Sequence, residues 1–417
     1  MSRRLTKRQK RQLNNMAKRH WKVLLAILLI MVVLFAVAYY MGWIDLLMNK
    51  YFPKDDDGDD EIVLSTAGGY ETTVDTIKDL KITFLDVGQA DCIIIQLPDG
   101  KNMIIDSGDY NSDQTVISNF TTANDIDTFH YLLLTHQHND HVGNMDWVLE
   151  NYKVNFIFRP NNYTTHSLAS SLPEIFNPVI TDEDAYISDT LAYAEFMVAA
   201  YNEGCTVELF NKDSDFTNTI ICGEDRTSYN FDFLTPIAVR EQVSYEDPNN
   251  YSPIFVLEYA GKTIMFNGDA EEAALEEYLT TYSGNYKNID VLKVGHHGSH
   301  NATSAEFLNA VDPEIAIIQC GLGNDYGHPH QVVLDMFDNY DGLEWYRTDT
   351  NGTITVTVGS NGDLNTVLTR TDMTYNNTCG DNMPETLQSF RPVSNEDMAT
   401  VVRLIRECCF LERKVVL

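Results

Sequence analysis

The stretch from Thr135 to His141 constrains this chain more than any other part of its sequence. It holds three histidines and one aspartate within six residues: His136, His138, Asp140 and His141. The apolar run 130–134 before it predicts a buried strand, and residues 142–145 after it predict the start of a helix. Imidazole and carboxylate groups without cysteine favour a catalytic divalent-metal site over a closed structural zinc site.

The spacing within this stretch predicts two metal positions. His136 and His138 lie two residues apart on an extended turn and can point at one ion, while Asp140 and His141 lie further round and can reach a second. A polar surface loop that happens to be rich in histidine is the alternative. That alternative is disfavoured because further aspartates and histidines follow at the ends of later predicted strands.

Length and charge bound the rest of the chain. Its 417 residues can hold one large domain or two ordinary ones, and 44% of them are hydrophobic, enough for a sizeable core. Of the 29 Lys and Arg residues, nine lie in residues 1–22, so 20 remain against 61 acidic residues, a net charge of -41 for residues 23–417. Such a body repels polyanions at long range, which disfavours a nucleic-acid partner, although a metal site can bind phosphate locally.

Residues 23–43 predict a transmembrane anchor. They contain no charged residue, end in an aromatic pattern that includes Trp43, and match the roughly 20 apolar residues needed to cross a bilayer. The basic tail 1–22 places the N-terminus in the cytoplasm and the body outside the cell membrane. A cleaved signal peptide is the alternative, because Ala36 to Ala38 resembles a cleavage site, but the apolar run continues past it. Either way we expect the body to be exported.

The segments that flank the body carry little chemistry. Residues 44–80 predict a flexible, acidic stalk, whose aspartate run lacks the ligand spacing of an EF-hand. Residues 371–417 form a tail for which the sequence predicts no role. The seven cysteines are an odd number, so at least one thiol is unpaired or pairs between chains, and no disulfide is predicted.

The body, residues 81–370, alternates predicted strands with polar, glycine-rich turns. The runs 81–87, 91–97 and 102–106 are apolar enough to be buried on both faces, which favours a sheet covered by other layers. Further strands are predicted at 154–158, 230–234, 254–259, 262–266, 291–294 and 314–319, and helices at 112–124, 182–201 and 271–279. Several strand ends deliver further aspartates and histidines: Asp106, Asp269, His296, His297 and His328. Alone, Asp269 would be a helix N-cap, but this company favours a site.

These motifs, taken in order, resemble the metallo-β-lactamase fold. The supporting phrases cover about residues 81–370 and are closer to the hydrolase domain of ComEC-type competence proteins: FLDVGQAD at 84–91, IDSG at 105–108, NGD at 267–269, LKVGHHGS at 292–299 and NDYGHP at 324–329. The resemblance implies a mixed α/β (α+β) domain, a four-layer αββα sandwich with its site along one edge of the two sheets. One N-terminal transmembrane helix would precede it.

The resemblance also implies a ligand set for two divalent ions, zinc in the first place and manganese as the alternative. His136 and His138 would hold the first ion, and Asp140 and His141 the second. Asp269 would bridge the two ions. One of His296 and His297 would complete the second site; we favour His297, with His296 contacting a substrate oxygen.

Other residues receive supporting roles. The resemblance implies that Asp106 orients ligand imidazoles and that His328 polarises the substrate or stabilises a leaving group. Asn250 and Ser252 are candidates for substrate contacts, with a plain turn as the alternative. Three residues of the first predicted turn either line the site or satisfy that turn: Asp86, Gln89 and Asp91.

Two departures from the family pattern matter. Many relatives supply another histidine to the first metal, but the only histidine between the second and fourth motifs here is His166, which has no motif around it. We do not expect it to be a ligand. ComEC-type proteins also join this domain to many membrane helices, whereas this chain predicts one, so the role in DNA uptake does not carry over with the domain.

The expected function is a membrane-anchored, extracytoplasmic hydrolase that uses a metal-activated water, with Asp140, Asp269, His296 and His328 as catalytic residues. A two-metal clamp suits phosphodiesters, either small molecules, nucleotides or envelope components, and lactones or amides are further options. A nuclease linked to DNA uptake is one alternative function. A non-catalytic surface-binding module is another, which the intact ligand set disfavours. The sequence predicts no oligomeric state.

Overall fold

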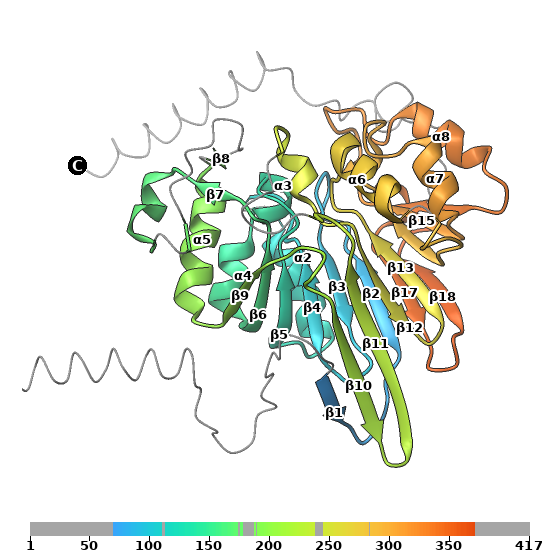
Figure 1. Ribbon diagram of the computed structural model, residues 1–417, viewed down its shortest axis with the longest axis horizontal. Helices are drawn as coiled ribbons and strands as arrows, with labels where there is room; N and C mark the ends of the chain where they lie inside the picture. The colour runs from blue at the N-terminus through green and yellow to red at the C-terminus, as the bar shows by residue number, and fades with distance from the viewer. Residues whose placement is uncertain are drawn as a thin grey trace, which may run out of the picture. The chain divides into compact units, whose positions relative to one another are not determined.

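The computed structural model describes residues 70–110, 113–173, 176–177, 187–188, 190–237, 245–282 and 284–371. Two eight-stranded sheets pack against each other in this part of the chain (Figure 1). The first sheet has the order β1-β10-β11-β12-β13-β14-β15-β16. Its strands are β1 (Tyr70–Thr73), β10 (Phe216–Cys222), β11 (Asp225–Phe233), β12 (Phe255–Tyr259), β13 (Lys262–Phe266), β14 (Val291–Lys293), β15 (Ile315–Ile318) and β16 (Glu344–Arg347).

The second sheet has the order β18-β17-β2-β3-β4-β5-β6-β9. Its strands are β2 (Leu80–Phe84), β3 (Ile93–Gln96), β4 (Asn102–Ile105), β5 (Thr128–Leu133), β6 (Lys153–Arg159), β9 (Thr206–Leu209), β17 (Ile354–Val358) and β18 (Leu364–Leu368). A small two-stranded sheet pairs β7 (Tyr163–Thr164) with β8 (Ile187–Ser188).

The core between the sheets is aromatic on the side of the first sheet. Phe255 stacks on Phe266 with ring centroids 4.8 Å apart, and it lies 5.3 Å from Phe233. Ile82 and Ile95 face them from the second sheet and are fully buried. Alternation of buried and exposed side chains along strands such as β11 directs one face of each sheet into this layer.

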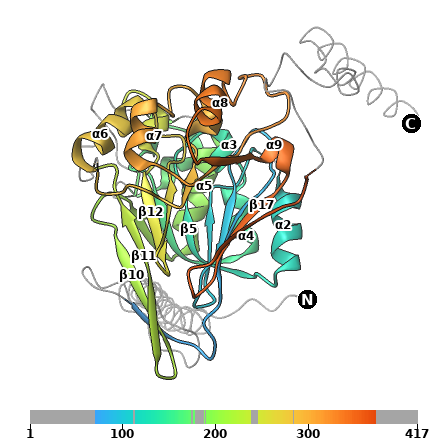
Figure 2. The same ribbon diagram turned by 90° about the vertical axis from the view of Figure 1, so that its right-hand side faces the viewer.

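Helices cover both outer faces (Figures 1 and 2). On the second sheet, apolar residues of α2 (Gln114–Ala123), α4 (Met145–Asn151) and α5 (Leu191–Glu203) pack on the strands. On the first sheet, α6 (Glu272–Tyr282), α7 (Ala305–Val311) and α8 (Gln331–Asp338) do the same. Two short helices, α3 (Asn139–Val142) and α9 (Thr348–Asn351), complete the described set. The two-sheet sandwich expected from the resemblance is therefore confirmed.

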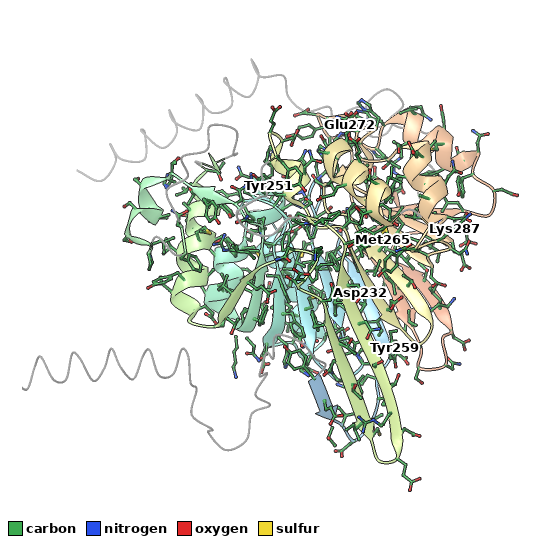
Figure 3. All side chains as sticks on the ribbon, viewed as in Figure 1. Asp232, Tyr251, Tyr259, Met265, Glu272 and Lys287 are labelled. Carbon is green, nitrogen blue, oxygen red and sulfur yellow. The ribbon has the colours of Figure 1, made fainter. Side chains whose placement is uncertain are left out.

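The parallel strands of each sheet end together on one side of the sandwich. Ile105 of β4 pairs with Leu133 of β5, and Phe266 of β13 pairs with Lys293 of β14. Polar turns follow all four residues, so the chain delivers its aspartates and histidines to one edge, as is usual at the carboxyl ends of parallel strands. In Figure 3, Tyr251 lies toward this edge and Tyr259 toward the opposite one.

The predicted linker at residues 44–80 is partly wrong, because Tyr70–Thr73 forms β1, which pairs in parallel with β10. A buried polar network holds it there, at the edge of the sandwich remote from the polar turns. Lys101 donates from Nζ to Thr72 Oγ1 and to Asp99 Oδ2, both at 2.7 Å, and Asn218 donates to the same carboxylate at 2.7 Å. Each buried polar group thus has a partner, which makes the docking of β1 favourable.

The helix predicted at 182–201 also differs. Within the described residues it begins at Leu191, because Ile187–Ser188 forms β8 and Thr190 is extended with φ -68° and ψ 145°. Residues 182–186 lie outside the described part. The helix ends at Gly204, whose φ of 75° is left-handed.

The predicted anchor 23–43, the basic tail 1–22 and nearly all of the C-terminal segment 371–417 lie outside the described residues. Among the helices that the structure does describe, none combines the length and apolar character needed to cross a membrane.

Candidate metal centre

Three turns bring the candidate ligands to one edge of the sandwich. The turn after β5 carries His136 and His138 and leads into α3, which contributes Asp140 and His141. The turn after β13 carries Asp269, and η4 (His296–Gly298) follows β14. The two sheets therefore share the site, since the turn after β5 belongs to the second sheet and the turns after β13 and β14 belong to the first.

Asp269 is the centre of the cluster and is almost fully buried. Its Oδ2 lies 3.2 Å from His141 Nε2, 3.6 Å from His297 Nε2 and 4.0 Å from His136 Nε2. Asp140 Oδ2 lies 3.3 Å from His297 Nε2. Four groups of three possible ligand atoms lie within 4.8 Å of one another among the described residues, and two of them consist of predicted ligands alone: His136, His141 and Asp269, and Asp140, His141 and His297.

His136 and His138 face each other, with His136 Nε2 3.0 Å from His138 Nδ1. On its other side His136 Nδ1 lies 3.2 Å from Ser252 Oγ. Burial lowers the pKa of His136 well below its ordinary value, and neighbouring imidazoles lower it further. The ring is therefore neutral at neutral pH, the form in which imidazole binds a metal.

The donor set fits a divalent cation. His141 Nε2 and Asp269 Oδ1 are two of the buried polar atoms in the described part of the chain that have no hydrogen-bond partner, and both lie in the cluster, although buried polar atoms are nearly always paired. Burial lowers the pKa of His297, but Asp269 and Asp91 outweigh it and raise the pKa to about 10. Without a metal, the imidazole of His297 therefore holds a proton beside these carboxylates. A divalent cation can take the place of that proton. The cluster can hold a divalent metal.

Asp106 supports the cluster from behind. Its Oδ2 lies 2.7 Å from His141 Nδ1, and its carboxylate accepts hydrogen bonds from Thr135 N at 2.8 Å and Thr135 Oγ1 at 2.7 Å. Burial raises the pKa of Asp106, and His141 opposes that rise. A carboxylate on the far nitrogen fixes both the tautomer and the orientation of a ligand imidazole.

Asp91 and Lys293 form a buried ion pair beneath His297. Lys293 Nζ lies 2.8 Å from Asp91 Oδ2, and both side chains are almost fully buried. Asp91 Oδ1 lies 3.3 Å from His297 Nδ1, which also lies 2.9 Å from the carbonyl oxygen of Gln319. The pair joins the two sheets, because Asp91 precedes β3 and Lys293 ends β14. Sequence reasoning placed Asp91 near the site but missed Lys293, which looked like an ordinary strand residue.

His296 contacts Glu271 through one ring nitrogen and faces Asp269 through the other. His296 Nδ1 lies 2.6 Å from Glu271 Oε1, and His296 Nε2 lies 3.6 Å from Asp269 Oδ2. Burial lowers the pKa of His296, but Asp269 and Glu271 outweigh it, so the pKa is raised. Asn249 donates from Nδ2 to Glu271 at 3.2 Å. Neither Glu271 nor Asn249 was predicted from the sequence.

A pocket of about 520 Å³ opens over the cluster. Its floor includes Asp140, Asp269 and His297, and its rim includes His328, Tyr326 and Gln89. Burial lowers the pKa of His328, and nearby imidazoles lower it further, to about 3. The predicted catalytic residues Asp140, Asp269, His296 and His328 all contribute to this one pocket.

Four residues singled out in the sequence lie elsewhere or do other work. Asp86 pairs with Arg370, so it does not face the pocket. Asn250 Oδ1 accepts from the backbone N–H groups of Glu271 and Ala274, which places it at the start of α6 instead of the expected substrate contact. Ser252 Oγ accepts a hydrogen bond from Asp269 N at 3.0 Å, so it positions a candidate metal ligand instead of contacting substrate. His166 caps η1 (Ser167–Ser171), away from the cluster.

Comparison with known proteins agrees with this geometry. The family model of the Metallo-beta-lactamase superfamily matches residues 85–321. ComE operon protein 3 of Bacillus subtilis is 28% identical over 290 residues, which are 66% of this chain and 32% of that protein. Competence protein ComA of Neisseria gonorrhoeae is 33% identical over 144 residues, 34% of this chain and 20% of that protein. The chain thus spans about a third or less of the length of these relatives.

Two solved structures are also similar. The metallo-beta-lactamase fold protein YhfI from Bacillus subtilis is 12% identical, with a TM-score of 0.37 over 66% of this chain and 99% of that one. A diphosphatase from the PhnP family is 11% identical, with a TM-score of 0.35 over 67% of this chain and 98% of that one. The matched family model covers more than half of the chain, from the turn after β2 to the turn after β15. The chain therefore belongs to the metallo-beta-lactamase superfamily.

Proposed function

We propose that this protein is a membrane-anchored, extracytoplasmic hydrolase of phosphodiester substrates that works with two divalent metal ions. One observation carries the proposal: ring nitrogens of four histidines lie within 4.0 Å of a single oxygen, Oδ2 of Asp269. A carboxylate shared by several imidazoles suits two ions held close together.

The residues divide between the two ions as follows. His136 and His138 would hold the first, Asp140, His141 and His297 the second, and Asp269 would lie between them. Zinc fits the mixed imidazole and carboxylate donors, and manganese is the alternative. Such ions supply Lewis acidity to the substrate phosphoryl group and make a water molecule more acidic.

The remaining side chains of the pocket bind and orient. Asp140, whose side chain is 30% exposed, can accept a hydrogen bond from the attacking water. His296 presents Nε2 to the pocket because Nδ1 is directed at Glu271. His328 lies 5.1 Å from His296, ring to ring, and its low pKa keeps it neutral, so it can donate or accept a hydrogen bond at the substrate.

Location and substrate size follow from the sequence. The apolar residues 23–43 behind a basic tail support a single-pass anchor with the hydrolase domain outside the cell membrane. The net charge of -41 for residues 23–417 favours a small phosphodiester, a nucleotide or an envelope component over a long polyanion.

A nuclease that serves DNA uptake is the second candidate. It is favoured by the matches to two competence proteins, one over 290 residues and one over 144. The acidic body counts against it, and so does the pocket, whose described lining contains neither Lys nor Arg.

The test uses the full-length protein in mild detergent, stripped with a chelator and reloaded with Zn²⁺ or Mn²⁺. Hydrolysis of bis(p-nitrophenyl) phosphate should require metal and fall by more than about 100-fold in Asp140→Ala, at least the loss seen for partners one step removed from a metal. Asp213→Ala is the matched control, because this carboxylate is exposed and forms its ion pair with its neighbour Lys212. Bound metal without turnover would remove the phosphodiesterase and direct the search to lactones and amides.

A further inference from the structure

Tyr326 is an exposed aromatic residue on the rim of the pocket. Its side chain is 69% exposed, the most of any large hydrophobic residue in the described part of the chain. It belongs to the turn between β15 and α8 and lines the same pocket as His296 and Asp269. Large aromatic side chains gain much from burial, so one held in the open beside a reaction site is typical of ligand recognition.

Three rings lie roughly parallel from the metal cluster out to this rim. The rings of His297 and His328 are 6.2 Å apart with an angle of 28° between their planes. The rings of His328 and Tyr326 are 5.8 Å apart with an angle of 24°. Tyr326 therefore ends a short stack, and its exposed surface can accept a further planar ring.

The turn that carries Tyr326 is held in place by Asn324. Asn324 Oδ1 accepts from the backbone N–H of Tyr326 at 3.1 Å and of His328 at 3.0 Å. Its Nδ2 donates to the carbonyl oxygens of His328 at 2.6 Å and Gly321 at 2.9 Å. Because the backbone that carries the ring is held before binding, less conformational freedom is lost when a ligand stacks on the ring.

The rest of the lining makes this ring distinctive. Apart from Tyr326, the described residues that line the pocket are histidines, carboxylates, amides and serine, without Lys or Arg. Lys and Arg, the usual partners of a polyanionic chain, are absent from that lining, so affinity beyond the metal cluster and its imidazoles has to come from hydrogen bonds and from the exposed Tyr326 ring.

We propose that Tyr326 determines substrate choice by stacking on a planar aromatic ring carried by the phosphate ester that the site binds. The inference rests on the proposed function for the presence of the phosphate group. It adds that the preferred esters carry an aromatic ring rather than an alkyl group within reach of the metal cluster.

The experiment compares two simple ligands on the full-length, Zn²⁺-loaded protein by titration calorimetry. Phenyl phosphate and methyl phosphate share the phosphate and differ in the ring. Phenyl phosphate should bind about 5- to 150-fold more tightly, which is the usual worth of aromatic stacking, about 1–3 kcal/mol, converted at 1.4 kcal/mol per tenfold. Tyr326→Ala should remove that preference while the affinity for methyl phosphate stays the same.

Two variants serve as controls. Tyr326→Phe keeps the ring and should keep the preference. Leu322→Ala removes exposed apolar surface from the same turn at a residue that does not line the pocket, and it should leave both affinities unchanged.

The outcomes separate this inference from the proposed function. Equal affinities in the unaltered protein, or a preference that survives in Tyr326→Ala, would overturn the inference even if bis(p-nitrophenyl) phosphate is hydrolysed. A ring preference that depends on Tyr326 without any hydrolysis would support the inference and overturn the phosphodiesterase. Binding of neither phosphate would overturn the inference as well.

Discussion

The Nδ1 atom of His296 lies 2.6 Å from Oε1 of Glu271, and this contact decides which nitrogen of the ring faces the pocket. His296 has a left-handed backbone with φ 44°, and so does His297 with φ 52°. Successive left-handed residues are costly for side chains other than glycine. Both imidazoles present Nε2 to Asp269 Oδ2 at 3.6 Å, and their further contacts differ: His297 also lies against Asp140 and His296 against Glu271.

Glu271→Gln should lower kcat by about 10- to 100-fold, because Glu271 positions His296. This is less than the full contribution of an acid–base side chain, since the imidazole itself remains. The amide keeps the shape but loses the charge that orients Nδ1. The loss should be larger for esters with poor leaving groups, which steady-state kinetics on a series of substituted phenyl esters would measure. Bound metal should stay the same.

Glu272→Gln is the control, because Glu272 is the next residue and lies exposed on α6 (Figure 3). Equal losses in both variants would mean that the start of α6, not the contact with His296, matters.

Asp106→Asn should weaken metal binding by about 10- to 100-fold, because His141 loses the carboxylate on its Nδ1. Competition with a metal-binding dye would measure this without any need for turnover. Asp113→Asn is the control: its carboxylate accepts from Asp109 N at 2.8 Å and supports the neighbouring turn. Unchanged affinity in Asp106→Asn would show that His141 is fixed by its surroundings alone.

Lys293→Met should destabilise the protein by about 3–5 kcal/mol, because it leaves the Asp91 carboxylate buried without its cation. The double variant Asp91→Asn with Lys293→Met should recover much of this loss. Urea unfolding of the four proteins in a double-mutant cycle would measure the coupling. Additive effects would contradict a direct pair.

The same pair predicts a dependence on pH in the metal-free protein. Burial raises the pKa of Asp91, but Lys293 and His297 outweigh it, so the folded-state pKa is below the ordinary 3.8. A lowered pKa contributes stability above about pH 4 that is lost as the pH falls through the folded value. The unfolding free energy of the double variant should therefore fall less steeply below about pH 4 than that of the unaltered protein.

Chelation should lower the thermal midpoint, since a ligand that binds only the folded state stabilises it by about 2.7 kcal/mol at 100 times its dissociation constant. Differential scanning calorimetry with Zn²⁺ and with EDTA would show the difference. Asp269→Ala should abolish it, because this carboxylate is shared by four imidazoles. A persistent shift in that variant would place the ion elsewhere.

The sequence predicts the strands and candidate ligands of the site well, but it does not predict the residues that hold those ligands in place. The strand at 262–266 coincides with β13, and the order of motifs was enough to identify the superfamily, because apolar runs and ligand spacing are local. Glu271 looked like one of several acidic residues at a helix start, and Lys293 like a strand residue. Both residues act through contacts with segments distant in the sequence, and a local sequence pattern carries no information about such contacts.

Asn250 shows a second limit of local pattern. The sequence left it as either a substrate contact or a plain turn residue, and its amide oxygen accepts hydrogen bonds from the backbone N–H groups of Glu271 and Ala274 at the start of α6. A buried asparagine near a site is as useful for holding a helix end as for binding, and only the partner atoms distinguish the two.

The docking of β1 has a practical consequence. Thr72 is bound to Lys101 at the edge of the sandwich remote from Asp269, so the chain joins the domain on the side away from the pocket mouth. A surface, bead or fusion partner attached before residue 70 would leave that mouth facing outward into the medium. Immobilising the protein through its N-terminal side should therefore leave the pocket accessible to substrate.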